Sequence, residues 1–258
     1  MDLGIKGRQA IVCASSRGLG RACAVSLSRE GVNVTLNGRD EAALKEAAEM
    51  CLTHGVKVQT ALGDMSLAST REALLDACPE PDILITNNGG PPPGVLADWD
   101  HDAWIGAFEA NMITHMLMIR AVLDGMVERK FGRIVNITSA MVKSPRALMG
   151  LSTGARTALS SVSKALSLEV ASANVTINNL LPERIHTGRQ EFMAKMQAER
   201  EGISVEQAYE KIANTIAAKR LGKPEELADA CAFLCSAQAS FISGQNLQID
   251  GGSYGGLI

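Results

Sequence analysis

The sequence lacks an apolar run long enough to cross a membrane, and its first residues, MDLGIKGRQA, do not form a signal peptide. We therefore expect a cytoplasmic protein. Excess charge is lacking too: the formal net charge is -3 over 258 residues. A nearly neutral chain has no bulk electrostatic attraction to nucleic acid or to an anionic membrane. Neither is expected as a partner.

Clusters of metal ligands are also lacking. The six cysteines and four histidines are scattered, and the cysteines show no spacing typical of a disulfide framework. Cys231 and Cys235 lie four residues apart in a predicted helix, 225–237, but no further ligands lie near them in the sequence. We expect both to be small buried apolar side chains, and we expect no metal site.

The pattern that is present is an alternation of short apolar runs and helical periods. A chain of 258 residues with 46% hydrophobic and 21% charged residues is ordinary for a soluble globular protein. Strands are predicted at 10–13, 32–37, 56–61, 83–86, 133–138 and 175–181, and helices at 18–31, 40–54, 66–78 (with Ser66 as N-cap), 103–129, 152–172 and 225–237. Such alternation predicts right-handed βαβ units. The expected fold is α/β: a doubly wound parallel sheet of the Rossmann type, three layers deep, in one domain spanning 1–258.

One segment, 188–218, breaks this rhythm. It is charged, rich in Gln, Glu and Lys, and helical in period, and it follows the carboxyl end of a predicted strand. Ligands of open α/β sheets bind outside those ends. The segment is therefore predicted to be a helical lid over a substrate site. A solvated surface excursion is the alternative.

A glycine-rich turn, Cys13 to Gly20 (CASSRGLG), follows the first predicted strand and opens a helix. Gly18 and Gly20 would let the backbone approach a pyrophosphate, which the free amides of the helix N-terminus would bind. This position between strand and helix indicates a dinucleotide site more strongly than the glycines alone.

With this turn the sequence resembles the short-chain dehydrogenase/reductase family, in particular 3-oxoacyl-ACP reductases. Ala14 replaces the first glycine of the family motif, which we expect to require only that the backbone there avoids positive φ. The resemblance continues in order along nearly the whole chain, through Asp64-Met65, Asn87 to Gly90, Asn111, Ile134 to Ser139, Pro182 to Thr187 (with Glu183 for a glycine), and a tail running from Gly222 through Gly244 to Gly252.

The resemblance implies a set of cofactor contacts: Ala14, Ser16, Arg17, Gly18, Leu19, Gly20, Arg39, Asp64, Met65, Asn87, Gly89, Arg156, Pro182, Ile185 and Thr187. The expected cofactor is NADP(H). In NAD-preferring sites an acid at the end of the second strand binds the ribose 2′-hydroxyl, and here that position is the neutral Asn37. Arg17 and Arg39 suit a 2′-phosphate. Solvated surface arginines are the alternative.

The implied catalytic residues include two departures from the family. Ser139 and Asn111 match its serine and asparagine, but Ser152 stands at the tyrosine position and Arg156 at the lysine position. An alignment that placed Lys164 at the family's lysine position would need an eight-residue gap. It would still place no tyrosine at the tyrosine position, because the chain contains only Tyr209 and Tyr254. Serine is a far weaker acid than a phenol of pKa about 10, and arginine stays protonated.

Three functions remain open at this stage. The first is an NADP(H)-dependent oxidoreductase acting on a carbonyl or secondary alcohol of a small molecule, with its proton supplied by water, Lys143 or His186. The second is an NADP(H)-binding protein with little or no redox activity, and the third is a fold reused for a non-redox reaction. The substrate pocket is expected along 91–96, 141–149 and 184–195.

A homotetramer is the expected assembly, as the resemblance implies. The predicted helices 103–129 and 152–172 carry more apolar residues than one buried stripe needs, which indicates a second apolar face. These residues are Met112, Met116, Met118, Leu123, Ala158, Leu159, Leu166 and Leu168.

Overall fold

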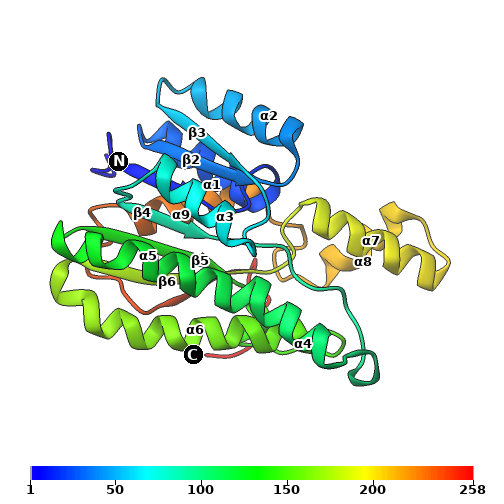
Figure 1. Ribbon diagram of the computed structural model, residues 1–258. Helices are drawn as coiled ribbons and strands as arrows, with labels where there is room; N and C mark the ends of the chain where they lie inside the picture. Colours follow the sequence, from blue (N-terminus) through cyan, green and yellow to red (C-terminus); the bar gives the residue numbers. More distant parts are fainter. Residues whose placement is uncertain (1, 258) are drawn as a thin grey trace.

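Seven parallel strands form the centre of the computed structural model, which describes residues 2–257 (Figure 1). Their order is β3-β2-β1-β4-β5-β6-β7, so the winding reverses between β1 and β4. The strands are β1 Gln9–Val12, β2 Asn33–Gly38, β3 Val58–Leu62, β4 Ile83–Thr86, β5 Gly132–Ile137, β6 Val175–Pro182 and β7 Asn246–Ile249. The predicted fold class is confirmed. Ligands of such sheets bind at the carboxyl ends beside the reversal.

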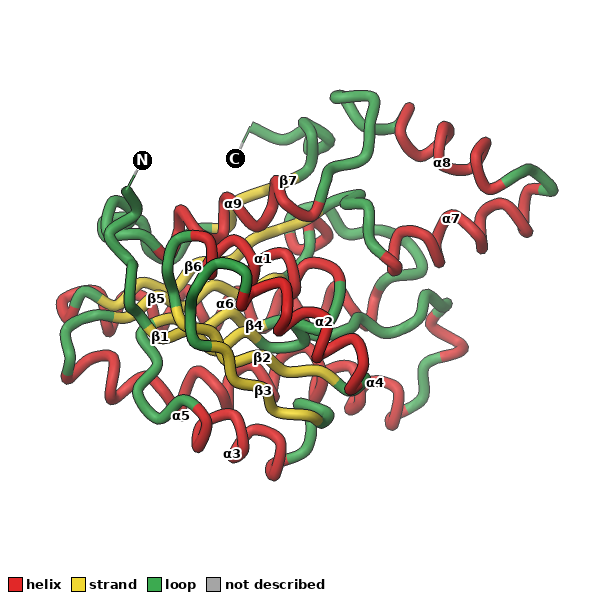
Figure 2. Tube along the Cα trace, turned by 90° about the horizontal axis from the view of Figure 1, so that it is seen from above, coloured by secondary structure: helices red, strands yellow, loops and turns green. Residues whose placement is uncertain are grey.

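Helices cover both faces of the sheet (Figures 1 and 2). Side chains of α1 (Gly18–Arg29), α2 (Glu41–Leu52) and α9 (Pro224–Cys235) pack in one apolar core with Ala10 and Val12 of β1. On the other face, α3 (Ala68–Ala77), α5 (Thr114–Glu128) and α6 (Gly150–Val170) pack with Ile11. Successive residues of β1 thus enter opposite cores, which explains why the strands are apolar throughout. Cys231 and Cys235 are buried in the first core, as predicted.

The predicted helix 103–129 is interrupted. It consists of α4 (His101–Phe108), a π-helical segment η2 (Glu109–Ile113) and α5. Single π-helical turns inside α-helices occur frequently at functional sites, and this one contains Asn111. Residues 2–257 also contain three short 3₁₀ helices: η1 Leu96–Asp98, η3 Ala140–Val142 and η4 Ala171–Ala173.

Two other expectations were wrong in detail. Ser66 is not a helix cap: α3 begins at Ala68, and the Ser66 amide instead donates a hydrogen bond to the Asp64 carboxylate. Strand β7 was not predicted. It has four residues, all partly or fully exposed, so it lacks the apolar run that marks the other strands.

The segment predicted as a lid forms two antiparallel helices, α7 (Gly188–Glu201) and α8 (Val205–Asn214), which project from the body in both views (Figures 1 and 2). They pack on each other through a small apolar cluster of their own. Arg189 at the start of α7 donates a hydrogen bond to the Pro91 carbonyl at 3.0 Å. The helix pair is therefore tied to the loop that follows β4.

A ladder of buried side-chain hydrogen bonds crosses four strands. Thr86 of β4 donates to Asn136 of β5 at 2.6 Å, and Asn136 donates to Asn179 of β6 at 2.9 Å. Asn179 in turn donates to Asn246 of β7 at 2.8 Å. Asn136 also donates to Ser163 of α6, so the ladder attaches that helix to the sheet near the carboxyl ends of the strands.

None of the helices in residues 2–257 is both long and apolar enough to cross a membrane.

Candidate cofactor and active site

The glycine-rich turn is built around Ala14, whose backbone has a φ of 45°. Our expectation that this residue avoids positive φ was therefore wrong. Hydrogen bonds on both sides hold it there: its amide donates to the Asn37 side chain at 3.2 Å, and its carbonyl accepts from Asn87 at 3.2 Å. The left-handed region costs a residue with a β-carbon about 1–2 kcal/mol, which these bonds offset.

The turn fits a pyrophosphate. A β-carbon on Gly20 would overlap the carbonyl oxygen of Ala14, so only glycine permits this close path. Gly18 has a φ of 58°, and α1 begins there with no side-chain cap and no acidic residue in its first turn. The amides of this helix end are therefore available to an anion. Thr187 of the loop after β6 lies 3.8 Å from a β-carbon placed on Gly18, so this loop borders the turn.

The end of β2 is one residue later than expected. The strand ends at Gly38, and the Asn37 side chain points inward, where it donates to the carbonyls of Ala61 and Gly63. Asn37 is therefore not the residue that would face a ribose, which corrects our assignment. A β-carbon on Gly38 would lie 2.6 Å from the Ser16 β-carbon. The strand end still lacks an acid that could bind a ribose 2′-hydroxyl, because Gly38 has no carboxylate and the space beside it leaves no room for one.

Two exposed arginines flank this strand end. Arg17 pairs with Asp40 at 2.6 Å, and Arg39 pairs with Asp64 at 3.4 Å. Asp40 was not predicted as part of this site; it is the N-cap of α2. The hydrogen bond from the Ala43 amide, and to a lesser extent Arg17, lowers the pKa of its carboxyl group. A bound phosphate would have to compete with these carboxylates for the guanidinium groups.

The remaining predicted cofactor residues lie around the same strand ends. Met65 is buried, and Leu19 packs against the core beneath the turn. Pro182 ends β6, and Ile185 is buried in the loop that follows. The Gly89 amide donates a hydrogen bond to the side-chain oxygen of Asn88 at 2.8 Å.

Ser152 and Arg156 lie one turn apart on α6, both almost fully buried. The Arg156 Nε donates to Ser152 Oγ at 3.3 Å. Its Nη1 donates to the carbonyls of Ile137 and Thr138 at 2.9 and 3.0 Å, and its Nη2 donates to the Asn88 carbonyl at 3.2 Å. The guanidinium thus joins α6 to the residues that follow β4 and β5. These carbonyl partners could not be predicted, because backbone groups leave no pattern in a sequence.

The charge of Arg156 survives this burial. Desolvation lowers its pKa to about 10, with a smaller contribution from Arg189, so it remains protonated at neutral pH. Four of the five guanidinium N–H groups are used in the bonds above. A β-carbon on Gly90 would lie 3.7 Å from Arg156 Nη2 and 3.6 Å from Ser152 Oγ, so the glycine loop borders both groups.

Ser139 and Asn111 approach this pair from two other elements. Ser139 follows Thr138, and its Oγ accepts the Met141 amide at the start of η3. Asn111 lies in the π-helical segment, which packs against α6, and is 1% exposed. Its Nδ2 donates to Ala107, while its Oδ1 has no hydrogen-bond partner among residues 2–257. That oxygen is available to a water molecule.

A buried histidine that the sequence did not mark lies near Arg156. Desolvation, with a smaller contribution from the Arg156 charge, lowers the pKa of His115 to about 3. Its imidazole is therefore neutral at physiological pH.

Lys143 and His186, the two candidate proton donors, have other contacts. Lys143 donates to Gln248 at 3.5 Å and lies 5.6 Å from the Tyr254 ring centre. His186 is exposed and stacks on Tyr209 of α8, with ring centres 5.7 Å apart. Within residues 2–257 neither side chain is hydrogen-bonded to Ser139 or Ser152, so the geometry assigns the proton to neither of them.

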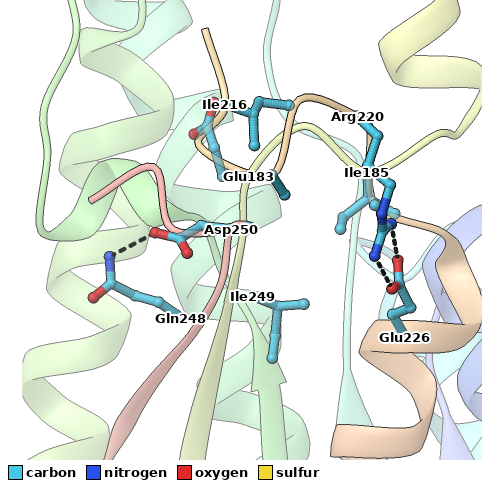
Figure 3. A pocket seen from close by; sticks show the side chains of 11 residues that line it. Glu183, Ile185, Ile216, Arg220, Glu226, Gln248, Ile249 and Asp250 are labelled. Atoms are coloured by element: carbon cyan, nitrogen blue, oxygen red, sulfur yellow. Dashed lines mark hydrogen bonds and ion pairs between the residues drawn. The ribbon is translucent and has the colours of Figure 1, made fainter. Parts of the chain in front are cut away.

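Two cavities lie near these loops. The larger, about 450 Å³, is lined by the loop from Gly89 to Gly94, by α4 and its preceding turn, and by Asn111 and Leu151. The smaller, about 210 Å³, lies where the loop after β6, the residues that follow α8 and the C-terminal tail meet (Figure 3). Arg220 and Glu226 form an ion pair at its wall, and Gln248 donates to Asp250. Its lining includes none of the predicted catalytic residues. No group of three or more potential metal ligands gathers anywhere in residues 2–257.

Comparison with known proteins identifies the family. The profile described as enoyl-(acyl carrier protein) reductase matches residues 13–254. The chain belongs to the short-chain dehydrogenase/reductase family. It is 31% identical to the NADPH-dependent reductase BacG of Bacillus subtilis, over 95% of this chain and 97% of that protein. It is 30% identical to the 3-oxoacyl-[acyl-carrier-protein] reductase FabG of Vibrio harveyi, over 98% and 99%.

Solved structures agree with this assignment. L-sorbose reductase from Gluconobacter frateurii, in complex with NADPH and L-sorbose, superposes with a TM-score of 0.94 at 28% identity, and each chain is covered completely. The NADPH-dependent reductase YwfH, involved in bacilysin biosynthesis, gives a TM-score of 0.91 at 30% identity, covering 98% of this chain and 100% of that one.

Proposed function

We propose that this short-chain dehydrogenase/reductase binds NADP(H) and interconverts a carbonyl and a secondary alcohol on a small molecule. The observation that carries the proposal is the end of β2, where Gly38 leaves no room for a carboxylate and Arg17 and Arg39 flank the site. Relatives described as NADPH-dependent support it. Charged hydrogen bonds to a 2′-phosphate are worth about 1.5–3 kcal/mol each, reduced here by the competition of Asp40 and Asp64.

The cofactor would supply the hydride, and the residues at the Ser152–Arg156 pair would prepare the carbonyl. In our assignment Ser152 occupies the family's tyrosine position and Arg156 its lysine position. The hydroxyl groups of Ser139 and Ser152 would donate hydrogen bonds to the carbonyl oxygen. Arg156 would hold Ser152 in place and lower the energy of the negative charge that develops on that oxygen.

The proton would reach the oxygen through water. No phenol stands on α6 at this point, and a serine hydroxyl is too weak an acid to be the ultimate donor. Asn111, whose buried Oδ1 has no hydrogen-bond partner in residues 2–257, is one of the residues that line the 450 Å³ cavity, and we infer that a water molecule enters there. In reduction, hydride adds to the carbonyl carbon, the C=O π electrons move to oxygen, and oxygen takes the proton; oxidation is the reverse.

A cofactor-binding protein without redox activity is the second candidate. The hydrogen bonds of Arg156 favour it, because four of its donors serve Ser152 and backbone carbonyls and only one is left for a ribose or an oxyanion. A non-redox reaction remains the third candidate, but the intact glycine turn argues for a bound dinucleotide.

Turnover separates the first two candidates. The wild type and the double variant Ser152→Tyr/Arg156→Lys would be assayed with NADPH and NADH on one panel of ketones, followed at the nicotinamide absorbance. We expect the wild type to oxidise NADPH with at least one ketone and to prefer it over NADH. A silent wild type beside an active double variant would show that the natural protein only binds the cofactor. Equal affinity for both cofactors in wild type and in Arg17→Ala/Arg39→Ala would refute the assignment of NADP(H).

We also propose a homotetramer. Of the apolar residues on α5 and α6, Met118 and Leu159 are buried within the subunit, but Leu168 is 71% exposed. Exposed apolar side chains on these helices are typical of a subunit interface. Analytical ultracentrifugation at micromolar concentration should show four copies, and a monomer would contradict the proposal.

A further inference from the structure

The 450 Å³ cavity is lined mainly by small apolar residues and prolines. Four small residues on one face of α4 and its continuation form one side, spaced as successive turns of a helix: Ala103, Gly106, Ala107 and Ala110. Three consecutive prolines, Pro91, Pro92 and Pro93, form the other side. Small side chains leave the space open and prolines make the wall stiff. The cavity is therefore a slot with apolar faces.

Trp99 forms the end of the slot and is held in place by two glycines. A β-carbon on Gly94 would lie 2.6 Å from its indole Nε1, and one on Gly150 would lie 2.5 Å from its ring. The indole is thus wedged between the loop after β4 and the start of α6. Trp104 packs against it edge to face, with ring centres 5.7 Å apart. This aromatic wall is rigid. Gly150, which contacts Trp99, lies two residues before Ser152 in the chain.

The slot leads to the reacting groups. Gly90 lines it, and a β-carbon on Gly90 would touch both Ser152 Oγ and Arg156 Nη2. Asn111 also lines it, 99% buried, with an Oδ1 that lacks a hydrogen-bond partner in the described chain. A molecule whose carbonyl lies at Ser152 could therefore extend past Gly90 into the slot.

The charges at the slot exclude an anion. Its lining contains two charged residues, Asp98 and Asp102, and no basic one. Both carboxylates lie on exposed residues at the rim, and Asp98 also accepts the Val95 amide. A carboxylate or phosphate placed in the slot would be repelled by these two carboxylates, and the nearest cations, Arg156 beside Gly90 and Arg189 at the Pro91 carbonyl, lie outside the lining. An uncharged apolar group meets no such penalty.

We propose that the slot binds an uncharged ring of the substrate, so that the protein acts on ketones or secondary alcohols that carry an alicyclic or aromatic ring next to the reacting carbon. The proposal rests on the proposed function for its chemistry, but binding of the ring does not require turnover. An apolar cavity of about 150 Å³ is enough for benzene, so the slot has room for one ring and part of a second.

Tryptophan fluorescence tests the binding directly, because the sequence contains two tryptophans, of which Trp99 lines the slot and Trp104 packs against Trp99. The probe is cyclohexyl methyl ketone. Acetone is the ringless control, and because it carries the same weak ketone absorption it also corrects for light absorbed by the carbonyl group. Both would be titrated into the full-length protein with and without NADPH. We expect a saturable change with the cyclohexyl ketone and none with acetone.

Gly106→Leu is the matched variant. A β-carbon on Gly106 meets nothing within 4 Å, and leucine favours the helix more than glycine, so the variant should fold. Its side chain would fill the slot and weaken binding of the cyclohexyl ketone at least tenfold, since methylene-sized changes in apolar pockets shift discrimination by about 10–200-fold. Ile105→Leu, on the exposed neighbour, is the control and should bind like wild type.

The outcomes separate the two proposals. If the cyclohexyl ketone binds to wild type and tenfold less to Gly106→Leu, the slot stands whether or not NADPH is oxidised. If ketones are reduced but the ring causes no saturable change, or Gly106→Leu binds it as wild type does, the slot proposal is wrong and the proposed oxidoreductase function is untouched. A ketone carrying a ring carboxylate that binds as tightly as the neutral one would also overturn it.

Discussion

Replacing Arg156 by lysine keeps the positive charge but removes the planar fork that reaches three carbonyl groups. Those carbonyls belong to Asn88, Ile137 and Thr138, and they lie in two separate segments of the chain. A lysine ammonium carries its three donors on one atom. We therefore expect Arg156→Lys to leave at least two of the three acceptors without a partner.

The loss can be estimated. A buried acceptor left unpaired costs about 1–3 kcal/mol, so two cost about 2–6 kcal/mol. Domains of this kind are stable by about 5–15 kcal/mol, which makes the expected loss a large part of the total. The double variant with Ser152→Tyr must therefore be shown to fold before its activity is interpreted.

Urea unfolding without cofactor measures this loss. Arg120→Lys is the control, because Arg120 is exposed on α5, and it should change the free energy of unfolding by less than about 0.5 kcal/mol. If Arg156→Lys unfolds like wild type and only its affinity for NADPH falls, then Arg156 is a cofactor ligand and the reasoning from its carbonyl bonds is refuted.

Three further predictions concern single residues. The folded-state pKa of His115 is about 3, below its usual 6.5, so the unfolded state binds more protons between these values and stability falls as pH decreases from 6.5 toward 3. His115→Gln should reduce the loss of stability between pH 7 and 5 in urea titrations; an unchanged loss would contradict the shift. Ala14→Gly should leave the melting temperature equal or higher, because glycine adopts a φ of 45° without strain, and a clear decrease would show that this strain is absent. Ser139→Ala should reduce turnover about 10²–10³-fold and Ser152→Ala less, and the reverse order in steady-state kinetics would assign the main donor to Ser152.

The sequence predicted the strands that are buried on both faces, because an apolar run leaves a strong pattern. It failed for β7, which is short and half exposed, and for the break in the helix at Asn111, since a π-helical turn inserts one residue without changing composition. The carbonyl partners of Arg156 could not be predicted, because backbone groups carry no sequence signal. Arg17 and Arg39 were predicted beside the strand end, but their acidic partners depend on how the loops fold.

The conformation of Ala14 shows a different limit. A positive φ at a residue with a β-carbon is rare, so sequence reasoning favours a relaxed backbone. Here two asparagines from neighbouring strands, Asn37 and Asn87, hold the peptide on both sides. Only the three-dimensional structure brings those three residues together.

The asparagine ladder has a consequence for how the chain selects its native pairing. Strands that are apolar on both faces carry little information about alignment, because a slip of one residue still buries apolar groups. Asn136 pairs directly with Thr86 and Asn179, and Asn179 with Asn246, at matching positions of four adjacent strands. Any misaligned sheet would leave these amides buried without partners, at about 1–3 kcal/mol each. The ladder thus penalises wrong alignments and leaves one arrangement, in which Thr86, Asn136, Asn179 and Asn246 stand side by side across β4, β5, β6 and β7.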